Sequence, residues 1–368
     1  MQIIRHRASE AEAVVFSERR RGRGARSNTS GRFENDHRVD TDDGWESLGS
    51  LDAFKTTVHP ETASSIIARN DSPDLSFDRS INPYRGCEHG CIYCYARPTH
   101  TYLGLSAGLD FETQIYAKTN AAARLRHELS RPGYTPASIA LGAVTDPYQP
   151  VEKHQNITRE ILEVLAEARH PVGIVTKSHL VTRDIDLLSR LAADKLVKVA
   201  ISITTLDRKV ARSMEPRAAT PERRLDAIRA LSAAGIPTTV MVAPVVPGLT
   251  DHEMERILEA GSSAGATAAG YVTLRLPLEL KTLFREWLTT DFPDRATRVI
   301  NLTQSLHGGV DYKSDFGTRQ RGRGPFADLI AQRFRLGLKR YGLARRSLKL
   351  RTDLFKPPNG HGVQLDLI

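Results

Sequence analysis

From residue 80 onward, short apolar runs rich in Val, Ile and Thr alternate with amphipathic segments. The runs recur at roughly 25–40 residues, and each gap has room for a helix, so the pattern predicts right-handed βαβ crossovers and a parallel sheet. Their number favours a partial (β/α)6 barrel of the TIM type, and no run is followed by the G-x-G-x-x-G of a dinucleotide fold. The runs are residues 111–118, 138–146, 171–177, 197–205, 237–247 and 268–276.

The segments between the runs carry helix-boundary signals. The clearest is 220–235, with Thr220 as the cap, Pro221 in the first turn and Gly235 at the end. Further helices are predicted at 156–169, opening with an Asn cap, at 251–265, opening with an acidic cap, and at 294–309 and 325–343. The final residues, 353–368, are predicted to be extended.

The pattern divides the chain into three parts. Residues 1–75 show weak periodicity and many Gly, Ser, Asn, Asp and Arg, which predicts an irregular N-terminal extension. Residues 76–290 form the predicted barrel, and residues 291–368 a helical, basic C-terminal extension. Within the first part, RGRGARSNTSGRF at 21–33 is predicted to be an arm that does not pack.

Composition narrows the setting of the protein. The 368 residues contain three cysteines, too few and too close together for a disulfide framework. The first residues lack the basic and apolar regions of a signal peptide, and no apolar run approaches the length of a membrane span. We therefore expect a reduced, cytoplasmic protein with no membrane partner.

The net charge of +9 is concentrated at the flanks. Residues 19–32 contain six arginines and no acid, and residues 311–351 contain twelve Lys or Arg against three Asp. Aromatic residues interleave with the second set. Such segments suit a nucleic-acid backbone, and DNA or RNA is a candidate partner. The alternative is that the C-terminal aromatics form the buried stripe of a helix and the charges its solvated face.

All three cysteines lie in one motif, Cys87-x3-Cys91-x2-Cys94, directly after a short apolar stretch. A mononuclear zinc site needs a fourth ligand, and no second pair of ligands follows. A cubane iron–sulfur cluster can be held by three cysteines with its fourth iron open. The motif favours a cluster that binds a ligand, with zinc or unreactive buried thiols as the alternatives.

This motif, with Tyr93 before its last cysteine, resembles the radical SAM superfamily. The resemblance implies that Cys87, Cys91 and Cys94 hold a [4Fe-4S] cluster whose open iron binds S-adenosylmethionine (SAM), with Tyr93 packed near the adenine. Reductive cleavage of SAM then yields a 5′-deoxyadenosyl radical, with electrons from a flavodoxin- or ferredoxin-type reductant. Residues 81–280 most resemble the spore photoproduct lyase-like ("DNA repair photolyase"-type) branch, through VTDPYQPVEK, VTKSHL, ISITTLD, MEPRAATPERRL, VMVAPVVPG and YVTLRLP.

The resemblance also suggests further contacts with the cofactor. Ligands gather where the strands of a β/α barrel end. Lys177 and Ser202 match positions that contact SAM in the lyase branch, and Thr145 or Asp146 would meet the ribose or the substrate. Arg224, like Arg217, would bind a carboxylate or phosphate bidentately, or else form an ion pair at a helix start.

One departure from the lyase branch affects the expected reaction. Spore photoproduct lyase returns a hydrogen atom from an additional cysteine, and the aligned position here is Ala143. We therefore predict that the chain does not reverse spore photoproduct. Tyrosine is the remaining type of hydrogen donor, with Tyr95, Tyr148 and Tyr271 as candidates. Asp146 and Tyr95 are the candidate catalytic residues.

These observations predict a lyase-like radical SAM enzyme that acts on nucleic acid. Two alternatives remain open at this stage. One is a radical SAM enzyme that acts on a protein or a small molecule, and the other is a non-enzymatic metal-cluster protein that binds nucleic acid.

Overall fold

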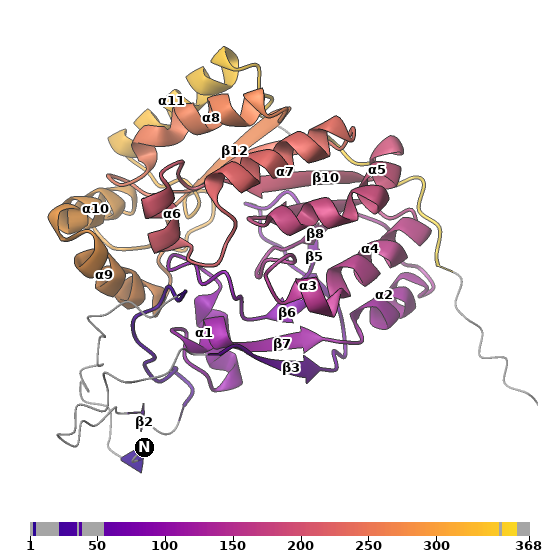
Figure 1. Cartoon of the computed structure of the whole chain (residues 1–368), viewed down its shortest axis with the longest axis horizontal. Coiled ribbons are helices and arrows are strands. Elements are labelled where there is room, and N and C mark those ends of the chain that lie inside the picture. The colour runs from indigo at the N-terminus through magenta and orange to yellow at the C-terminus, as the bar shows by residue number, and fades with distance from the viewer. Residues whose placement is uncertain (1–2, 5–21, 35–36, 39–54, 346–347, 359–368) are drawn as a thin grey trace, which may run out of the picture.

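The computed structural model describes residues 3–4, 22–34, 37–38, 55–345 and 348–358. Its centre is a seven-stranded sheet in the order β12-β11-β10-β9-β8-β5-β4 (Figure 1). Six of these strands are parallel neighbours, and only β4 runs antiparallel. The bounds are β4 (Ile67–Arg69), β5 (Arg79–Ile81), β8 (Ile139–Leu141), β9 (Val172–Thr176), β10 (Val197–Ser202), β11 (Thr238–Val245) and β12 (Ala268–Thr273). The predicted partial (β/α)6 barrel is confirmed.

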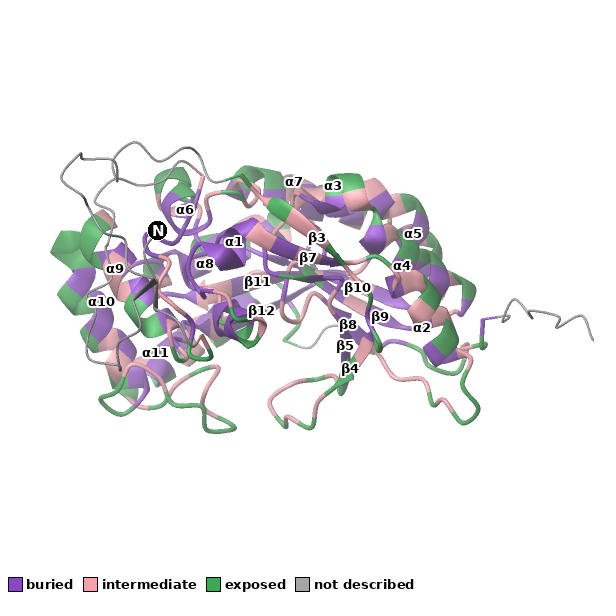
Figure 2. Ribbon diagram, turned by 90° about the horizontal axis from the view of Figure 1, so that it is seen from below, coloured by how far each residue is buried: buried purple, intermediate pink, exposed green. Residues whose placement is uncertain are grey.

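Helices follow the strands and cover the outer face of the sheet. Buried residues line the strands and the inward sides of these helices (Figure 2). The helices of the repeat are α2 (Ala121–Leu129), α3 (Glu152–Gln155), α4 (Ile157–Glu167), α5 (Ile185–Ala193), α6 (Arg208–Met214), α7 (Pro221–Ala233) and α8 (Met254–Ser263). Helix α7 has the predicted ends, since the Thr220 hydroxyl accepts from the Arg223 amide and Gly235 has a φ of 74°. At α4, Asn156 occupies the cap position, but its side chain makes no capping hydrogen bond and instead accepts from Arg183 at 2.8 Å.

One predicted run belongs to another sheet. Residues 111–118 begin in the short helix α1 (Asp110–Thr113) and continue as β7 (Gln114–Lys118). Strand β7 pairs with β3 (Thr57–Glu61) and β6 (Tyr84–Arg85) in a three-stranded sheet. The prediction of a barrel strand here was wrong, because the apolar period identifies a strand without identifying its partners. The first barrel strand is β5.

The N-terminal part is more ordered than its composition suggests. It supplies β3 and β4, and β1 (Ile3–Ile4) pairs with β2 (His37–Arg38). Residues 23–27 are buried, so the prediction of an unpacked arm was wrong for this part of the segment. Its glycines permit a close backbone approach, and its buried arginines have carboxylate or carbonyl partners. Arg19, Arg20 and Arg21 lie outside the described residues.

Helix α9 (Leu280–Asp291), which the sequence did not predict, ends where the predicted C-terminal extension starts, and the extension contains the predicted α10 (Pro293–Leu306) and α11 (Pro325–Arg340). Between α10 and α11, residues 313–324, called here the bridging loop, reach both outer ends of the sheet. The Gln320 carbonyl accepts from the Thr273 amide on β12, and Arg319 pairs with Asp74 in the loop after β4, at 2.7 Å. The loop thus spans the open side of the partial barrel.

The chain after α11 crosses the edge at which the parallel strands begin. The Ala344 carbonyl accepts from Ala269, and the Arg351 and Lys356 amides donate to Lys195 and Ala168. Residues 353–358 have no helix or strand, and the rest of the predicted extended tail, 359–368, lies outside the described residues. Within the described ranges, no helix has the length and apolar character needed to cross a membrane.

Candidate active site

The three cysteines lie on the loop between β6 and the 3-10 helix η2 (Arg97–Leu103). Cys87 and Cys91 are buried and Cys94 is partly exposed. Successive turns shape the loop, with Gly90 N–H donating to the Cys87 carbonyl and Cys94 N–H to the Cys91 carbonyl, each at 3.2 Å. The Cys87 amide donates to Phe111, which anchors the loop on α1. The loop therefore holds all three thiols in one buried place.

Cys87 and Cys91 are buried near carboxylates. Burial raises the pKa of Cys87 and of Cys91, and nearby carboxylates raise them further, Asp146 acting on Cys87 and Glu215 on Cys91. Cys91 and Cys94 also raise the pKa of Cys87, and Cys94 raises that of Cys91, as expected for thiols that share one short loop. As thiolates they need the positive charge of a metal centre. The donor set fits an iron–sulfur cluster, held by Cys87, Cys91 and Cys94.

The arrangement also bears on the zinc alternative. Among the residues described, no group of three or more His, Cys, Asp or Glu side chains is placed to hold one metal ion. A zinc ion requires all its sulfur and nitrogen ligands to converge within about 2.0–2.3 Å of one point. The cysteines of a four-iron cluster bind different iron atoms and lie farther apart. Three cysteine ligands without a fourth suit a cluster with an open iron better than a mononuclear zinc site.

Asp146 follows β8 and ties the cysteine loop to the next strand. Its carboxylate accepts hydrogen bonds from the Thr176 hydroxyl at 2.7 Å and the Lys177 amide at 2.8 Å, and His89 Nδ1 lies 3.4 Å away. Burial alone would raise its pKa, but His89 and these hydrogen bonds lower it to about 2. Asp146 is thus an anion with several protein partners, which suits a positioning role better than proton transfer.

Lys177 and Ser202 lie beside each other on the inner face of the sheet. Thr176 pairs with Ile201 in the parallel register, so the next residues of both strands are also neighbours. At β9 this face is open to solvent, because Val175 is 39% exposed, whereas Ser202 on β10 is buried. The Lys177 ammonium lies 5.7 Å from the centre of the Tyr93 ring and has no acidic partner among the described residues. The structure therefore brings Tyr93, Lys177 and Ser202 together.

Arg224, another predicted contact, is bound to protein groups. The nitrogens of Arg224 donate to the carbonyls of Ala219 and Ser202, at 2.8 and 3.0 Å, and to the Glu215 carboxylate. The ion-pair alternative for Arg224 is confirmed, and the guanidinium faces protein partners where an anionic ligand was expected. The same Glu215 accepts from the Tyr93 hydroxyl, so this buried group fixes the tyrosine ring.

Thr145 and Arg217 likewise hold loops. The Thr145 hydroxyl donates to the Tyr84 carbonyl at 3.0 Å. Arg217 pairs with Glu88 in the cysteine loop, at 3.0 Å. Both side chains are therefore already bound to protein groups. Their positions support the loops around the site.

Of the three candidate hydrogen donors, only Tyr95 lies at the cysteine loop with an exposed ring. It is 41% exposed, and its hydroxyl donates to the carbonyl of Ala143. The Arg275 guanidinium lies 4.0 Å from the centre of this ring and has no carboxylate partner among the described residues. Tyr271 is instead on the outer side of β12, where it packs on Phe334.

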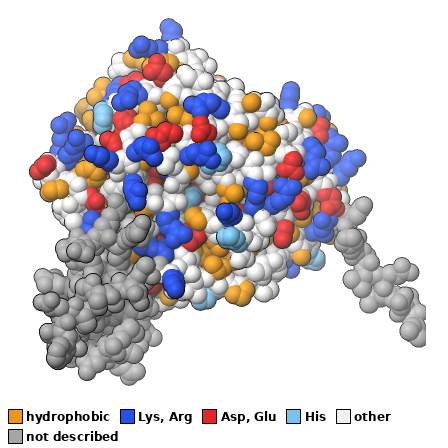
Figure 3. Space-filling model, viewed as in Figure 1, with side chains coloured by type: hydrophobic (Ala, Val, Ile, Leu, Met, Phe, Trp, Pro, Cys, Tyr) orange, Lys and Arg blue, Asp and Glu red, His pale blue; other side chains and the backbone are white. Residues whose placement is uncertain are grey.

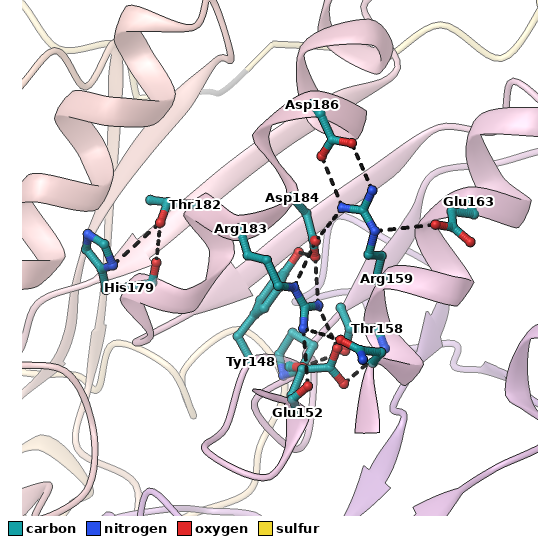
Figure 4. Close-up of polar contacts among 12 residues, drawn as sticks. Tyr148, Glu152, Thr158, Arg159, Glu163, His179, Thr182, Arg183, Asp184 and Asp186 are labelled. Atoms are coloured by element: carbon teal, nitrogen blue, oxygen red, sulfur yellow. Dashed lines mark hydrogen bonds and ion pairs between the residues drawn. The ribbon is translucent and has the colours of Figure 1, made fainter. Parts of the chain in front are cut away.

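Tyr148 belongs to a buried network of charges (Figure 4). Its hydroxyl donates to Asp184 at 3.0 Å, and burial with this carboxylate raises its pKa well above the ordinary value. Arg183 pairs with Glu152 at 2.7 Å, and Arg159 with Asp184 at 2.9 Å. The network joins the loop after β8 to α4 and to the 3-10 helix η3 (His179–Asp184). It holds the backbone next to Asp146, and no local pattern in the sequence predicts it.

The sequence also did not single out Arg97 and Glu112, which form a fully buried pair beneath the cysteine loop. Arg97 lies three residues after Cys94, but nothing local distinguishes it from a surface arginine. Its partner lies fifteen positions away. The pair becomes visible only when η2 and α1 fold against each other.

Comparisons with known proteins agree with this geometry. Residues 81–261 match the Radical SAM superfamily. An uncharacterized protein of Mycobacterium tuberculosis is 42% identical over 226 residues, which cover 61% of this chain and 66% of the relative. The radical SAM Nalpha-GlyT isomerase of Pseudomonas phage M6 is 29% identical over 188 residues, 49% of this chain and 37% of the phage protein.

Among solved structures, a spore photoproduct lyase variant with bound AdoMet and dinucleoside spore photoproduct is similar in fold. The TM-score is 0.56 at 17% identity, and the alignment covers 78% of this chain and 81% of the lyase. At this level of identity the similarity concerns the fold. The chain spans about two thirds of the length of the mycobacterial relative that it matches.

Proposed function

The chain belongs to the radical SAM superfamily, whose members use a [4Fe-4S] cluster and SAM, and we propose that it is an enzyme that cleaves SAM reductively and acts on nucleic acid. The bound cofactors supply the 5′-deoxyadenosyl radical. Cys87, Cys91 and Cys94 hold the cluster, and a flavodoxin- or ferredoxin-type protein delivers the electron. The observation that carries the proposal is the buried three-thiol loop beside an open sheet face that presents Lys177.

The chain's own residues bind and orient the cofactor. The Lys177 ammonium pairs with the SAM carboxylate. It is available for this contact because it has no acidic partner among the described residues. The Tyr93 ring packs near the adenine, held there by Glu215. The Ser202 hydroxyl meets the ribose or the methionine part. Thr145, Asp146 and Arg224 position these groups through the contacts they already make.

The proposal of a nucleic-acid substrate rests on Tyr95 and Arg275. An exposed aromatic ring with an arginine stacked on it, next to the cluster loop, offers a base a stacking surface and a phosphate a cation. Basic side chains elsewhere support this less strongly, because on the face shown in Figure 3 Lys and Arg are interspersed with Asp and Glu. The alternative is a protein or small-molecule substrate.

The absence of a further cysteine shapes the reaction. All three cysteines are assigned to iron, so hydrogen return to a product radical needs another donor. We propose Tyr95 as the candidate, since its hydroxyl contacts the Ala143 backbone, at the position that carries cysteine in the lyase. We do not expect repair of spore photoproduct. The cytoplasmic location and the boundaries at 75 and 290 also remain predictions.

The first experiment measures 5′-deoxyadenosine from the anaerobically reconstituted, dithionite-reduced protein and SAM. Cys87→Ala should abolish production. Lys177→Ala should reduce kcat/KM about 10- to 100-fold, because a hydrogen bond to a charged group contributes about 1.5–3 kcal/mol. Lys153→Ala, an exposed lysine on α3, is the matched control. A wild-type protein with a full cluster and no product would refute the proposed enzyme and favour a structural metal site.

The second experiment tests the substrate class by nucleic-acid binding at several salt concentrations. Arg275→Ala should weaken binding and reduce the salt slope by about 1 if the guanidinium contacts a phosphate. Arg190→Ala, which removes an exposed arginine from α5, controls for net charge. If DNA and RNA neither bind nor change SAM turnover, the protein or small-molecule alternative holds.

A further inference from the structure

Residues 22–32 of the N-terminal part, called here the strap, lie directly on the cysteine loop. The amides of Gly24 and Ala25 donate to the two carboxylate oxygens of Glu112, at 2.9 and 2.8 Å. A Cβ on Gly24 would lie 1.9 Å from the carbonyl oxygen of Gly90, between two of the cysteines. Since a real Cβ cannot approach so closely, this contact requires glycine. The strap and the cysteine loop are thus in backbone contact.

Glu112 joins the strap to Arg97. Both side chains are fully buried, and Arg97 Nη2 lies 2.5 Å from a Glu112 oxygen that also accepts from the strap. Arg97 Nε and Nη2 donate to the carbonyls of Cys91 and Gly90, at 2.9 and 3.1 Å. Its Nη1 reaches two further carbonyls, at 107 and 108. One carboxylate therefore links the strap amides to the backbone that bears a cluster cysteine.

The strap is also fixed at its far side. Arg26 pairs with Asp291 and the Ser27 hydroxyl donates to Glu286, both on α9 and both at 2.7 Å. Asn28 exchanges two hydrogen bonds with Asp110 at the start of α1, each at 2.9 Å. The strap is thus held between α9 and α1 while its glycine contacts the cysteine loop.

From this geometry we infer that Arg97 and Glu112 are positioning residues that clamp the strap onto the cysteine loop and keep that loop in its cluster-binding conformation. The inference rests on the proposed cluster binding. The strap covers the loop from outside, so it also slows loss of the cluster in air. No part of this role requires the strap to touch SAM or the substrate.

Gly24→Ala tests the clamp, because the added methyl group must displace either the strap or the Gly90 carbonyl. Gly173→Ala on β9 is the matched control, where a Cβ would meet nothing nearer than 3.5 Å. After anaerobic reconstitution of the full chain, iron and sulfide content should fall in Gly24→Ala, with about tenfold weaker cluster retention. The EPR signal of the reduced cluster should shift, and its visible absorbance should bleach faster in air.

A measurement on the iron-free protein separates this inference from the proposed function. Hydrogen exchange of peptides covering 87–97 should be roughly tenfold faster in Gly24→Ala than in the wild type, while the barrel strands keep their protection. If the strap does not hold the loop, the wild-type protein still cleaves SAM. If the proposed function is wrong, the difference in hydrogen exchange between Gly24→Ala and the wild type is still observed. Wild-type exchange, iron content and bleaching in Gly24→Ala would overturn the inference.

A second variant is used if circular dichroism shows that the Gly24→Ala protein is unfolded. Glu112→Gln keeps the volume of the side chain, but it replaces one acceptor oxygen by an amide group that faces a donor. The same changes in exchange and cluster retention are expected, and Glu160→Gln, the same substitution at an exposed position on α4, is its control. Unchanged exchange at 87–97 in a folded Glu112→Gln protein would also overturn the inference.

Discussion

The strap and the bridging loop are two Arg- and Gly-containing segments with opposite surroundings. In the strap, Arg23 and Arg26 are buried, and Arg26 is paired with Asp291. In the bridging loop, Arg321 is exposed and its guanidinium lies 4.8 Å from the ring centre of Tyr271. Two segments of similar composition therefore differ in their surroundings: the strap packs in the interior, and the bridging loop lies at the surface. Charge and glycine content alone do not distinguish the two.

The glycines differ in the same way. Gly24 has an ordinary φ and is required because there is no space for a Cβ. Gly322 in the bridging loop has a φ of 75°, which a side chain rarely adopts, so the turn itself requires glycine, and a Cβ there would also lie 2.7 Å from Leu306 Cβ. Glycine thus lets the strap approach another backbone and lets the bridging loop reverse direction. A comparison of arginine substitutions, from fully buried to exposed, tests how far this difference extends.

The largest effect is expected for Arg97→Ala, under the strap. The substitution leaves Glu112 charged and buried without its partner, because both side chains are fully buried in the ion pair. Removal of one partner of a buried pair typically costs about 3–5 kcal/mol. Denaturant unfolding of the iron-free protein measures this loss in the free energy of unfolding. Arg97→Lys, which keeps the charge but fewer hydrogen bonds, should lose less, and a loss under about 1 kcal/mol in Arg97→Ala would contradict the assigned burial.

Arg26→Ala is expected to have the second largest effect. Arg26 is almost fully buried, but Asp291 keeps a hydrogen bond from Ser213 at 3.1 Å after the substitution. We expect a loss of about 2–3 kcal/mol in the free energy of unfolding. Thermal unfolding is the measurement. Arg212→Ala on α6, next to Ser213, is the control. Equal stabilities would mean that the strap is not anchored on α9.

These contacts explain how far the sequence could be interpreted. The barrel was predictable because its strands and helices repeat a local apolar pattern that the core requires. The cysteine site was predictable because all three ligands lie within eight residues. Lys177 and Ser202 were expected at the site from the resemblance to the lyase branch, together with their places at strand ends. Each of these signals is local or periodic.

The strap could not be predicted in this way. Its partner Glu112 lies 87 residues from Ala25, and Asp291 lies 265 residues from Arg26. Nothing near Arg26 in the sequence indicates a buried carboxylate, so an arginine-rich, glycine-rich stretch was interpreted as an exposed arm. The run at 111–118 failed for the same reason, since the pairing of β7 with β3 and β6 depends on residues far along the chain.

The bridging loop should show a smaller effect. Asp74 accepts from the Gly317 amide at 2.6 Å and pairs with Arg319, in a partly buried place between the two ends of the sheet. Asp74→Asn keeps an acceptor for the amide and removes the charge, so we expect a loss of about 1–2 kcal/mol. Thermal unfolding is the measurement, with the exposed Asp71→Asn as the control. A loss as large as that of Arg97→Ala would show that the two segments are not energetically different.

The smallest effect on stability is expected for Arg323→Ala in the bridging loop. Its side chain is 68% exposed and its ion pair with Asp315, at 3.8 Å, is exposed as well, so removal should change the free energy of unfolding by at most about 0.5 kcal/mol. Because this charge is not used internally, it remains available to a polyanion. If nucleic acid binds across the bridging loop, the variant should reduce the salt slope of binding by about 1. Arg26→Lys, which keeps the strap's internal charge, should leave that slope unchanged, and the reverse result would mean that the strap supplies the binding charges.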